Sequence, residues 1–144
     1  MTEMVLPNDA NQRGNLLGGR LMHWIDLAAA IAAKRHSGRV CVTASVDELN
    51  FHVPIKLGEV VTLKASVNRA FRTSMEVGVR VTAESADQSK PRLANNAYLT
   101  FVAIDESDRP VPVPEILPES PDEQRRYDEA QARRQSRLQR RRKQ

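Results

Sequence analysis

The sequence predicts an α+β domain in which a curved antiparallel sheet wraps around one long central helix. Three observations support this fold class. A single long, largely apolar helical segment lies near the N-terminus. Four segments in which apolar and polar residues alternate follow it, as expected of strands with one face on a core. The links between these segments are short, which favours antiparallel pairing.

The helix is expected at residues 18–36, after a short strand at residues 3–6 and a loop of turn-forming residues. Its composition is rich in Ala and Leu, its last turn is basic, and Gly38 follows it. Before that basic turn its only charged or strongly polar side chains are Arg20, His23 and Asp26. A helix that is apolar over most of its circumference is expected to be enclosed by other structure.

The four strands are expected at residues 40–47, 61–68, 75–84 and about 93–104. The third has the clearest alternation, and both faces of the fourth are fairly apolar. Turn-forming residues occupy the links at 53–58, 71–73 and 86–91. The pattern therefore predicts an antiparallel meander after the helix.

The C-terminal part is expected to differ from the body of the domain. Five prolines fall within residues 110–121, which excludes a regular helix or a central strand there. We therefore divide the chain into a domain at 1–109, a Pro-rich connector at 110–121 and a basic helical tail at 122–144. Tyr127, Ala130 and Leu138 are sparse apolar contacts, so the tail helix is expected to dock only partly, and its end past Leu138 is expected to fray.

The formal net charge of +4 comes from this tail. The last 20 residues hold nine Lys or Arg and two acidic residues, whereas the first 124 residues hold 13 and 16. This distribution argues against a basic nucleic-acid groove built into the fold. Cys41 is the only cysteine, nothing resembles a signal peptide, and the longest apolar stretch is too short to span a bilayer. A cytoplasmic protein without a membrane span is expected.

Several common catalytic motifs are absent from the sequence. It contains no Gly-x-Ser-x-Gly, no His-Glu-x-x-His, no Cys-x-x-Cys and no phosphate-binding Gly-rich loop followed by Lys. The three histidines are scattered, so no metal site is expected. No base is suggested beside Cys41, which is therefore not a credible nucleophile.

Candidate chemistry lies where the Asn-rich loop at residues 11–17 meets the helix. Free backbone N–H groups at a helix start can bind an oxyanion or a polarised carbonyl oxygen, and Gly18 and Gly19 allow close approach. Asp26 lies about two turns further on, on broadly the same face. An unpaired buried carboxylate is costly, so Asp26 either pairs with His23 or Arg20 or faces a wet cleft.

Taken as a whole, the sequence resembles the cytosolic acyl-CoA hydrolase family of hotdog-fold thioesterases. The resemblance runs from about Met4 to Ile104 without a large gap. It is carried by these blocks: Asn11-x-x-Gly14-x-x-x-Gly18-Gly19-x-Leu21-Met22-x-Trp24-x-Asp26, Val42-Thr43-Ala44-Ser45-Val46-Asp47, Phe51-x-x-Pro54-x-x-x-Gly58, Thr73-Ser74-Met75-x-Val77 and Phe101-Val102-Ala103. The basic helical tail also resembles those of relatives.

The resemblance implies an enzyme that hydrolyses acyl-CoA thioesters to free fatty acid and coenzyme A, without a cofactor. It implies dimers that pair their sheets edge to edge and assemble further, typically to hexamers as trimers of dimers. The active site would be composite, with Asn11 from one subunit and Asp26 from its partner. Asp26 would be the general base or the attacking carboxylate, Asn11 would position the water or the carbonyl, and the N–H groups near Gly18 and Gly19 would hold the carbonyl oxygen.

The resemblance also implies a coenzyme A site at Arg69, Arg72, Thr73 and Ser74, whose side chains suit phosphates and pantetheine amides. Simple solvation explains the two arginines equally well. The segment around Thr43 could line the cleft, although an edge or interface strand explains it as well.

Two other readings stay open from the sequence. A hotdog hydratase or dehydratase would use an Asp–His dyad, but Asp47 and His52 lie after the helix rather than near it. A non-catalytic protein could bind acyl-CoA, or could use its Arg-rich tail to engage RNA, acidic lipid or protein. The tail lacks interleaved aromatic residues, so specific nucleic-acid binding is not expected. Truncation before Arg125 is expected to leave thioesterase activity largely intact if assembly survives.

Overall fold

The computed structural model describes residues 1–87 and 90–143. Part of the link expected at 86–91, Gln88 and Ser89, and the last residue of the tail, Gln144, lie outside the described residues. The elements in chain order are β1 (Thr2–Met4), the 3-10 turn η1 (Pro7–Asp9), α1 (Gly18–Ser37), β2 (Val40–Phe51), β3 (Val60–Ala70), β4 (Ser74–Glu84), β5 (Arg92–Ile104) and α2 (Pro121–Arg142).

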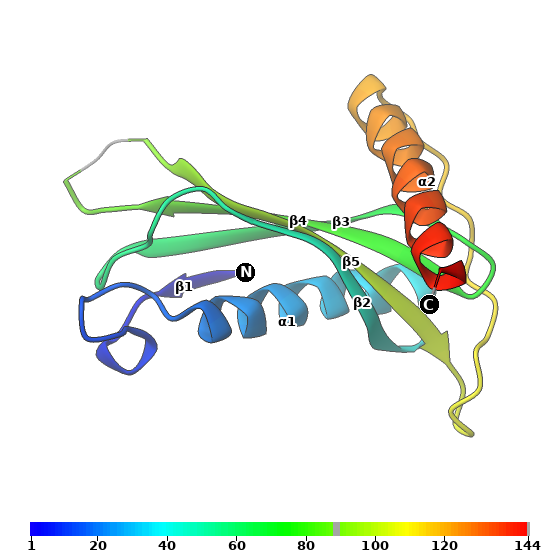
Figure 1. The fold of residues 1–144 in the computed structure, drawn as a ribbon, viewed down its shortest axis with the longest axis horizontal. Helices are drawn as coiled ribbons and strands as arrows, with labels where there is room; N and C mark the ends of the chain where they lie inside the picture. Colours follow the sequence, from blue (N-terminus) through cyan, green and yellow to red (C-terminus); the bar gives the residue numbers. More distant parts are fainter. Residues whose placement is uncertain (88–89, 144) are drawn as a thin grey trace.

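The strands form one antiparallel sheet in the order β1-β3-β4-β5-β2. The sheet is twisted and curved, α1 lies along one face, and α2 crosses the other (Figure 1). We call these the inner and the outer face. The predicted fold class, a long helix against a curved antiparallel sheet, is confirmed, and so are the positions of the helix and the four main strands.

Helix α1 is built to approach the sheet closely. It begins after Leu17, which provides no capping side chain, and ends at Gly38, whose φ of 68° is a left-handed conformation that glycine adopts without strain. Its buried residues are Leu21, Trp24, Ile25, Ala28, Ala29 and Ala33. The small alanine side chains let the helix backbone lie near the strands.

The expectation that α1 is enclosed all round is wrong for a single chain. Leu27 and Ile31 are 45% and 41% exposed and lie one turn apart on the same side of the helix. The sheet covers only one side of α1, so this apolar stripe faces outward in the monomer.

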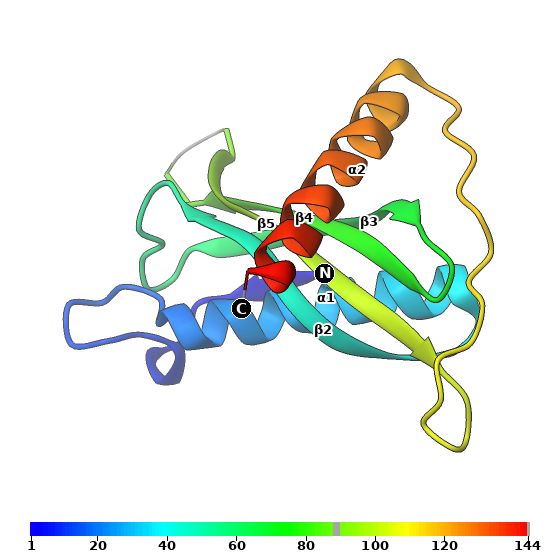
Figure 2. The ribbon, with the colours of Figure 1, turned by 45° about the vertical axis from the view of Figure 1, so that its right-hand side comes forward.

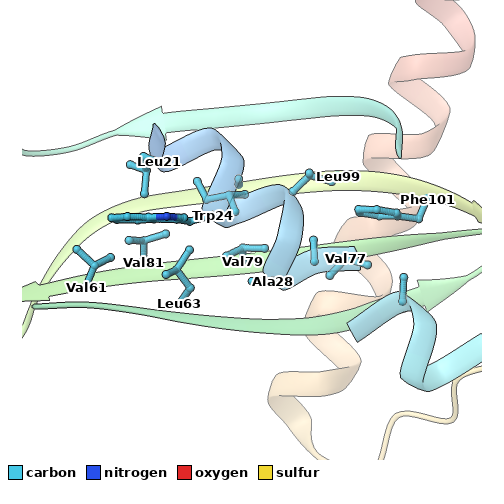
Figure 3. Close-up of a cluster of buried hydrophobic side chains, with 14 of the residues drawn as sticks. Leu21, Trp24, Ala28, Val61, Leu63, Val77, Val79, Val81, Leu99 and Phe101 are labelled. Atoms are coloured by element: carbon cyan, nitrogen blue, oxygen red, sulfur yellow. The ribbon is translucent and has the colours of Figure 1, made fainter. Parts of the chain in front are cut away.

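The hydrophobic core fills the space between α1 and the inner face of the sheet. Figure 3 shows Leu21, Trp24 and Ala28 of α1 against inward-facing side chains of three strands. These strand residues are Val61 and Leu63 of β3, Val77, Val79 and Val81 of β4, and Leu99 and Phe101 of β5. The apolar residues of the period-two alternation are thus those on the inner face of the sheet.

Strand β2 is an edge strand that pairs with β5 alone within the described chain. It has register shifts after Thr43 and after Val46, and it exposes several large apolar side chains. These are Val40, Val42, Val46 and Phe51. A long apolar edge with unpaired backbone groups is a template for pairing with another strand.

The connector before α2 is extended, as predicted from its prolines, and it is fixed to the body. Val111 N donates to Ala103 O at 2.9 Å, Val113 N donates to Arg72 O at 2.9 Å, and His36 Nε2 bonds Pro114 O at 2.7 Å. Val113 is buried. These contacts define the path by which the chain passes from the end of β5 to the outer face.

Helix α2 begins with a capping bond, in which Ser120 Oγ accepts from Glu123 N at 3.1 Å, and with Pro121 in its first turn. The helix extends past Leu138 and ends at Arg142. Figure 2 shows α2 lying across the outer face, with its last turns over β5 and β2.

Most residues of α2 remain exposed or half-buried, and its sparse apolar residues are not its main contacts with the sheet. Ala130 is fully buried, but the main contacts are ionic. Arg133 makes two hydrogen bonds to Glu76 at 2.7 and 2.9 Å, and Arg137 makes one to Asp47 at 3.0 Å. The Glu76 and Asp47 side chains are 1% and 4% exposed, so the helix is held by charge pairs at the sheet surface.

Candidate active site

The Asn-rich loop is organised around the side chain of Asn11. Asn11 Oδ1 accepts from Arg13 N at 2.9 Å and from Asn15 N at 3.1 Å, and Asn11 N donates to Asn15 O at 2.8 Å. Gly14 completes the turn with a φ of 76°. The loop uses only the oxygen of the exposed amide, so the Nδ2 hydrogens have no partner among the described residues and remain available to an acceptor.

The start of α1 is open to solvent. Gly18 and Gly19 are exposed, and no atom lies within 4 Å of where a Cβ would be. Leu17 provides no capping side chain, while Arg20 pairs with Asp9 at 3.1 Å and ties the loop to the helix. The first backbone N–H groups of the helix can therefore approach an oxygen atom of a ligand.

Asp26 has a partner that the sequence did not suggest. Thr43 Oγ1 of β2 donates to Asp26 Oδ1 at 2.6 Å, and Asp26 is half-buried. The pairing with Arg20 that the sequence left open is wrong, since Arg20 is bonded to Asp9. The structure thus brings Asp26 and Thr43 together where α1 meets the edge strand.

Asp26 and the start of α1 lie on one helix but at a distance. Eight residues separate Gly18 from Asp26, which is about 12 Å at a rise of 1.5 Å per residue. A reacting carbonyl must lie about 3 Å from both its attacking group and its oxyanion donors. Along the helix axis of one chain, the two groups are therefore about two turns apart.

The hairpin between β3 and β4 holds Arg72, Thr73 and Ser74 near the same end of the sheet as Thr43. Ser74 pairs with Val102 of β5, and Val102 pairs with Val42 of β2. Two strand spacings, about 10 Å, therefore separate Ser74 from the strand of Thr43. Arg72 is exposed, and Thr73 and Ser74 are half-buried.

Arg69 differs from the other three hairpin candidates because it contacts α2. Its guanidinium lies 3.8 Å from the centre of the Tyr127 ring and donates to Tyr127 O at 3.2 Å. It pairs across the strands with Glu76, which itself bonds α2. Arg69 therefore lies on the outer face, whereas Asp26 lies on the inner face.

The Asp–His dyad that a hydratase would need is not assembled. Asp47 bonds Arg137 and Thr100, while His52 Nε2 lies 2.7 Å from Asn96 Oδ1. No group of three or more His, Cys, Asp or Glu that could hold a metal ion occurs in the described ranges. Within those same ranges, neither helix is long and apolar enough to cross a membrane.

Comparison with known proteins places the chain in a family. Residues 13–90 match the model of the thioesterase superfamily. The chain is 42% identical over 138 residues to mouse acyl-coenzyme A thioesterase 11, covering 96% of this chain but 23% of that protein. It is 43% identical over 122 residues to the acyl-CoA thioester hydrolase YkhA of Bacillus subtilis, covering 85% and 71%. The chain thus spans about a quarter of the mouse relative's length.

Two solved structures superpose on nearly the whole of this chain. A hexameric acyl-CoA thioesterase superposes with a TM-score of 0.93 at 38% identity, covering 97% of this chain and 90% of that one. The acyl-CoA hydrolase of Staphylococcus aureus, solved in complex with butyryl coenzyme A and coenzyme A, superposes with a TM-score of 0.92 at 40% identity, covering 98% and 86%.

Variants of the Staphylococcus aureus enzyme have also been solved, and in each a single Asn, Asp or Thr is replaced by Ala. These three residues have the same spacing along that chain as Asn11, Asp26 and Thr43 have here. The resemblance found in the sequence is confirmed, and the chain belongs to the thioesterase superfamily as a member of its hotdog-fold acyl-CoA thioesterases.

Proposed function

We propose that this protein hydrolyses acyl-CoA thioesters to a free acid and coenzyme A. The observation that carries the proposal is the 2.6 Å bond between Thr43 and Asp26, on the helix whose start is open to solvent. In one route Asp26 takes a proton from water, which attacks the thioester carbonyl and gives the free acid directly. In the other, the Asp26 carboxylate attacks and forms a mixed anhydride, which water then hydrolyses to release the acid and restore Asp26. In both routes the C–S bond breaks and coenzyme A leaves as its thiol. The reaction needs no cofactor, because coenzyme A is part of the substrate.

In this mechanism Thr43 orients Asp26 through Oδ1 and leaves Oδ2 free to take a proton from water or to attack the carbonyl. Asn11 offers its amide hydrogens to the water or the carbonyl. The backbone N–H groups at Gly18 and Gly19 stabilise the negative charge that develops on the carbonyl oxygen.

The site is completed by a second subunit. The distance of about 12 Å along the helix axis between Gly18 and Asp26 of one chain supports this arrangement. The apolar edge of β2 and the exposed Leu27 and Ile31 of α1 supply a surface for pairing. A two-fold dimer would bring Asn11 and the helix start of one chain to Asp26 of the other. A hexamer built as a trimer of dimers is the expected assembly, supported by the hexameric relative.

Coenzyme A is proposed to bind Arg72, Thr73 and Ser74 at the β3–β4 hairpin. Arg69, on the outer face near the same hairpin, is the fourth residue proposed for this site. The hairpin lies at the same end of the sheet as Thr43, and its exposed cation and hydroxyl groups suit phosphate and amide groups. The cytoplasmic location stays a prediction from the sequence, as does the division of the chain at 109 and 121.

The test is thiol release from a series of acyl-CoAs, from short to long chains, by the purified protein. Turnover of at least one member supports the proposal. Calorimetric titration with the same acyl-CoAs distinguishes an enzyme from a non-catalytic binding protein. Such a binding protein would bind acyl-CoAs without releasing thiol. Loss of absorbance from an enoyl-CoA without release of thiol would instead indicate a hydratase and would contradict the proposal.

Thr43→Val is expected to lower kcat about tenfold, with KM nearly unchanged. Valine keeps the shape of threonine but cannot donate to Asp26, and one hydrogen bond is worth about 1.4 kcal/mol, or a factor of ten in rate. Thr43→Ser keeps the hydroxyl and is the matched control, expected to stay within about threefold of the wild type. Equal loss in both variants would mean that the hydrogen bond is not what matters.

A further inference from the structure

Strand β2 presents Thr43 to Asp26 from an interrupted part of its ladder. Its pairing with β5 shifts register directly after Thr43 and again directly after Val46. Each shift leaves one residue of β2 without a direct partner, and the first of these, Ala44, follows Thr43. Bulges disrupt a ladder locally and re-aim the side chains beside them. Because Thr43 is also exposed on an edge strand, its position depends on what holds this segment against β5.

The carboxylate of Asp47 connects both irregularities. Asp47 is the residue without a direct partner at the second register shift. Its Oδ1 accepts from Ser45 Oγ at 3.2 Å, and its Oδ2 accepts from Thr100 Oγ1 of β5 at 3.1 Å. Ser45 and Thr100 are paired across the strands in the first row after Thr43. The Asp47 side chain therefore ties the bulged segment to β5 next to the residue that orients Asp26.

Helix α2 supplies the counter-charge of this carboxylate. Arg137 Nη1 donates to Asp47 Oδ2 at 3.0 Å, and the two side chains are 14% and 4% exposed. Among the described residues, this is the only hydrogen bond or ion pair between α2 and β2. Beside it a cavity of about 300 Å³, lined in part by Glu48 and Arg140, separates the two elements. The last turns of α2 lie over β5 and β2 (Figure 2), so a single ion pair links the helix to the strand of Thr43.

The charge of Arg137 matters because Asp47 is almost fully buried. A buried carboxylate is costly without a cation. Without Arg137, Asp47 would turn toward water, and its bonds to Ser45 and Thr100 would lengthen or break. The bulged segment would then be held against β5 by an interrupted ladder alone.

We infer that Arg137 is a positioning residue for the bond between Thr43 and Asp26, and that it acts from the outer face of the sheet through Asp47. The inference rests on the proposed function, in which this bond orients the Asp26 carboxylate. Arg137 itself bonds neither of the two residues. The inference gives the C-terminal helix a part in catalysis besides its part in stability.

Arg137→Gln is expected to lower kcat about fivefold with KM nearly unchanged, less than Thr43→Val does, because the bond to Asp26 is loosened rather than removed. Thiol release is measured at a temperature where circular dichroism and size-exclusion chromatography verify folding and assembly. Arg137→Lys keeps a cation that can donate to Asp47 and should retain at least about half of the wild-type kcat. Arg141→Gln removes an exposed arginine one turn further along α2 and is the matched control, expected to match the wild type.

A double-mutant cycle separates positioning from stability. In the Thr43→Val background the bond to Asp26 is already absent, so Arg137→Gln should change kcat by less than about twofold. A purely structural role would lower kcat by the same factor in both backgrounds. If Arg137→Gln does not fold, Asp47→Asn/Arg137→Met removes both charges and leaves no buried charge unpaired. This variant should fold and show the same loss of kcat.

Amide hydrogen exchange gives a readout that needs no turnover. Arg137→Gln should speed exchange at residues 43–47 and leave exchange in β3 as in the wild type. Unchanged exchange at 43–47 overturns the inference, and so does an equal loss of kcat in both backgrounds. If the wild type releases no thiol from any acyl-CoA, the proposed function fails, and exchange alone then decides whether Arg137 holds the strand of Thr43 in place.

Discussion

Replacing Asp26 by asparagine is expected to lower kcat for acyl-CoA hydrolysis by about 10²–10⁴-fold and to change KM little. Asparagine has the shape of aspartate and can still accept the hydrogen bond from Thr43 Oγ1, so α1 and β2 keep their contact. What is lost is the negative charge that takes a proton or attacks the carbonyl. Removing a general base or a nucleophile costs this much because no other group at the same position can replace it.

The measurement is steady-state thiol release, with size-exclusion chromatography to verify assembly. Asp105→Asn is the matched control: Asp105 Oδ1 accepts from Ser107 N and Arg109 N in a surface turn, asparagine can do the same, and kcat should not change. If Asp26→Asn keeps more than about a tenth of the wild-type kcat, its carboxylate does not take part in the chemistry.

Mixing two inactive variants tests whether the site is shared between subunits. If Asn11 comes from one chain and Asp26 from the other, a dimer of Asn11→Ala with Asp26→Asn contains one intact site and one doubly altered site. Random re-association of equal amounts should then restore about a quarter of the wild-type activity. Half of the dimers are mixed, and in each mixed dimer one of the two sites is intact. No recovery after verified exchange of subunits would place both residues in one chain.

The elements that local pattern specifies were predictable from the sequence. The helix and the four main strands could be predicted because their signals are local. The period of the strands and the apolar composition of the helix depend on neighbouring residues and on one buried face. Strand β2 runs to Phe51, beyond its predicted end at 47, because Leu49 continues the alternation between the polar Glu48 and Asn50. The candidate site was found through its ordered blocks of residues, not through the pattern of any single element.

Contacts between elements distant in sequence were not predictable. The partners considered for Asp26 were three and six residues away on the same helix, whereas its actual partner, Thr43, lies 17 residues away on another element. The alternation places Glu76 on the polar face of β4, together with Gly78 and Arg80, but does not show what covers that face. Glu76 is 1% exposed because α2, 57 residues further along the chain, covers it.

Arg133→Ala is expected to lower the free energy of unfolding by about 3–5 kcal/mol, the largest effect on stability that we anticipate from a single substitution. Glu76 is almost fully buried and receives two hydrogen bonds from Arg133 and one from Asn68. Burial lowers the pKa of Arg133, but its bonds to Glu76 and the charge of that carboxylate raise it more, so the guanidinium stays charged. Without Arg133, which also stacks on Tyr98 at 3.7 Å, the buried carboxylate loses its counter-charge.

Chemical denaturation of the wild type, Arg133→Ala and Arg125→Ala measures this effect. Arg125 is 58% exposed and forms only long contacts with Asp122 and Glu129, so its loss should cost less than about 1 kcal/mol. Equal midpoints for the two variants would mean that the ion pair does not hold α2. The same contacts revise the expectation for truncation before Arg125, which would strip the counter-charges from both Glu76 and Asp47. Loss of activity in such a truncated chain would therefore be expected from a weakened fold, and a tail that bound RNA, lipid or protein would not be needed to explain it.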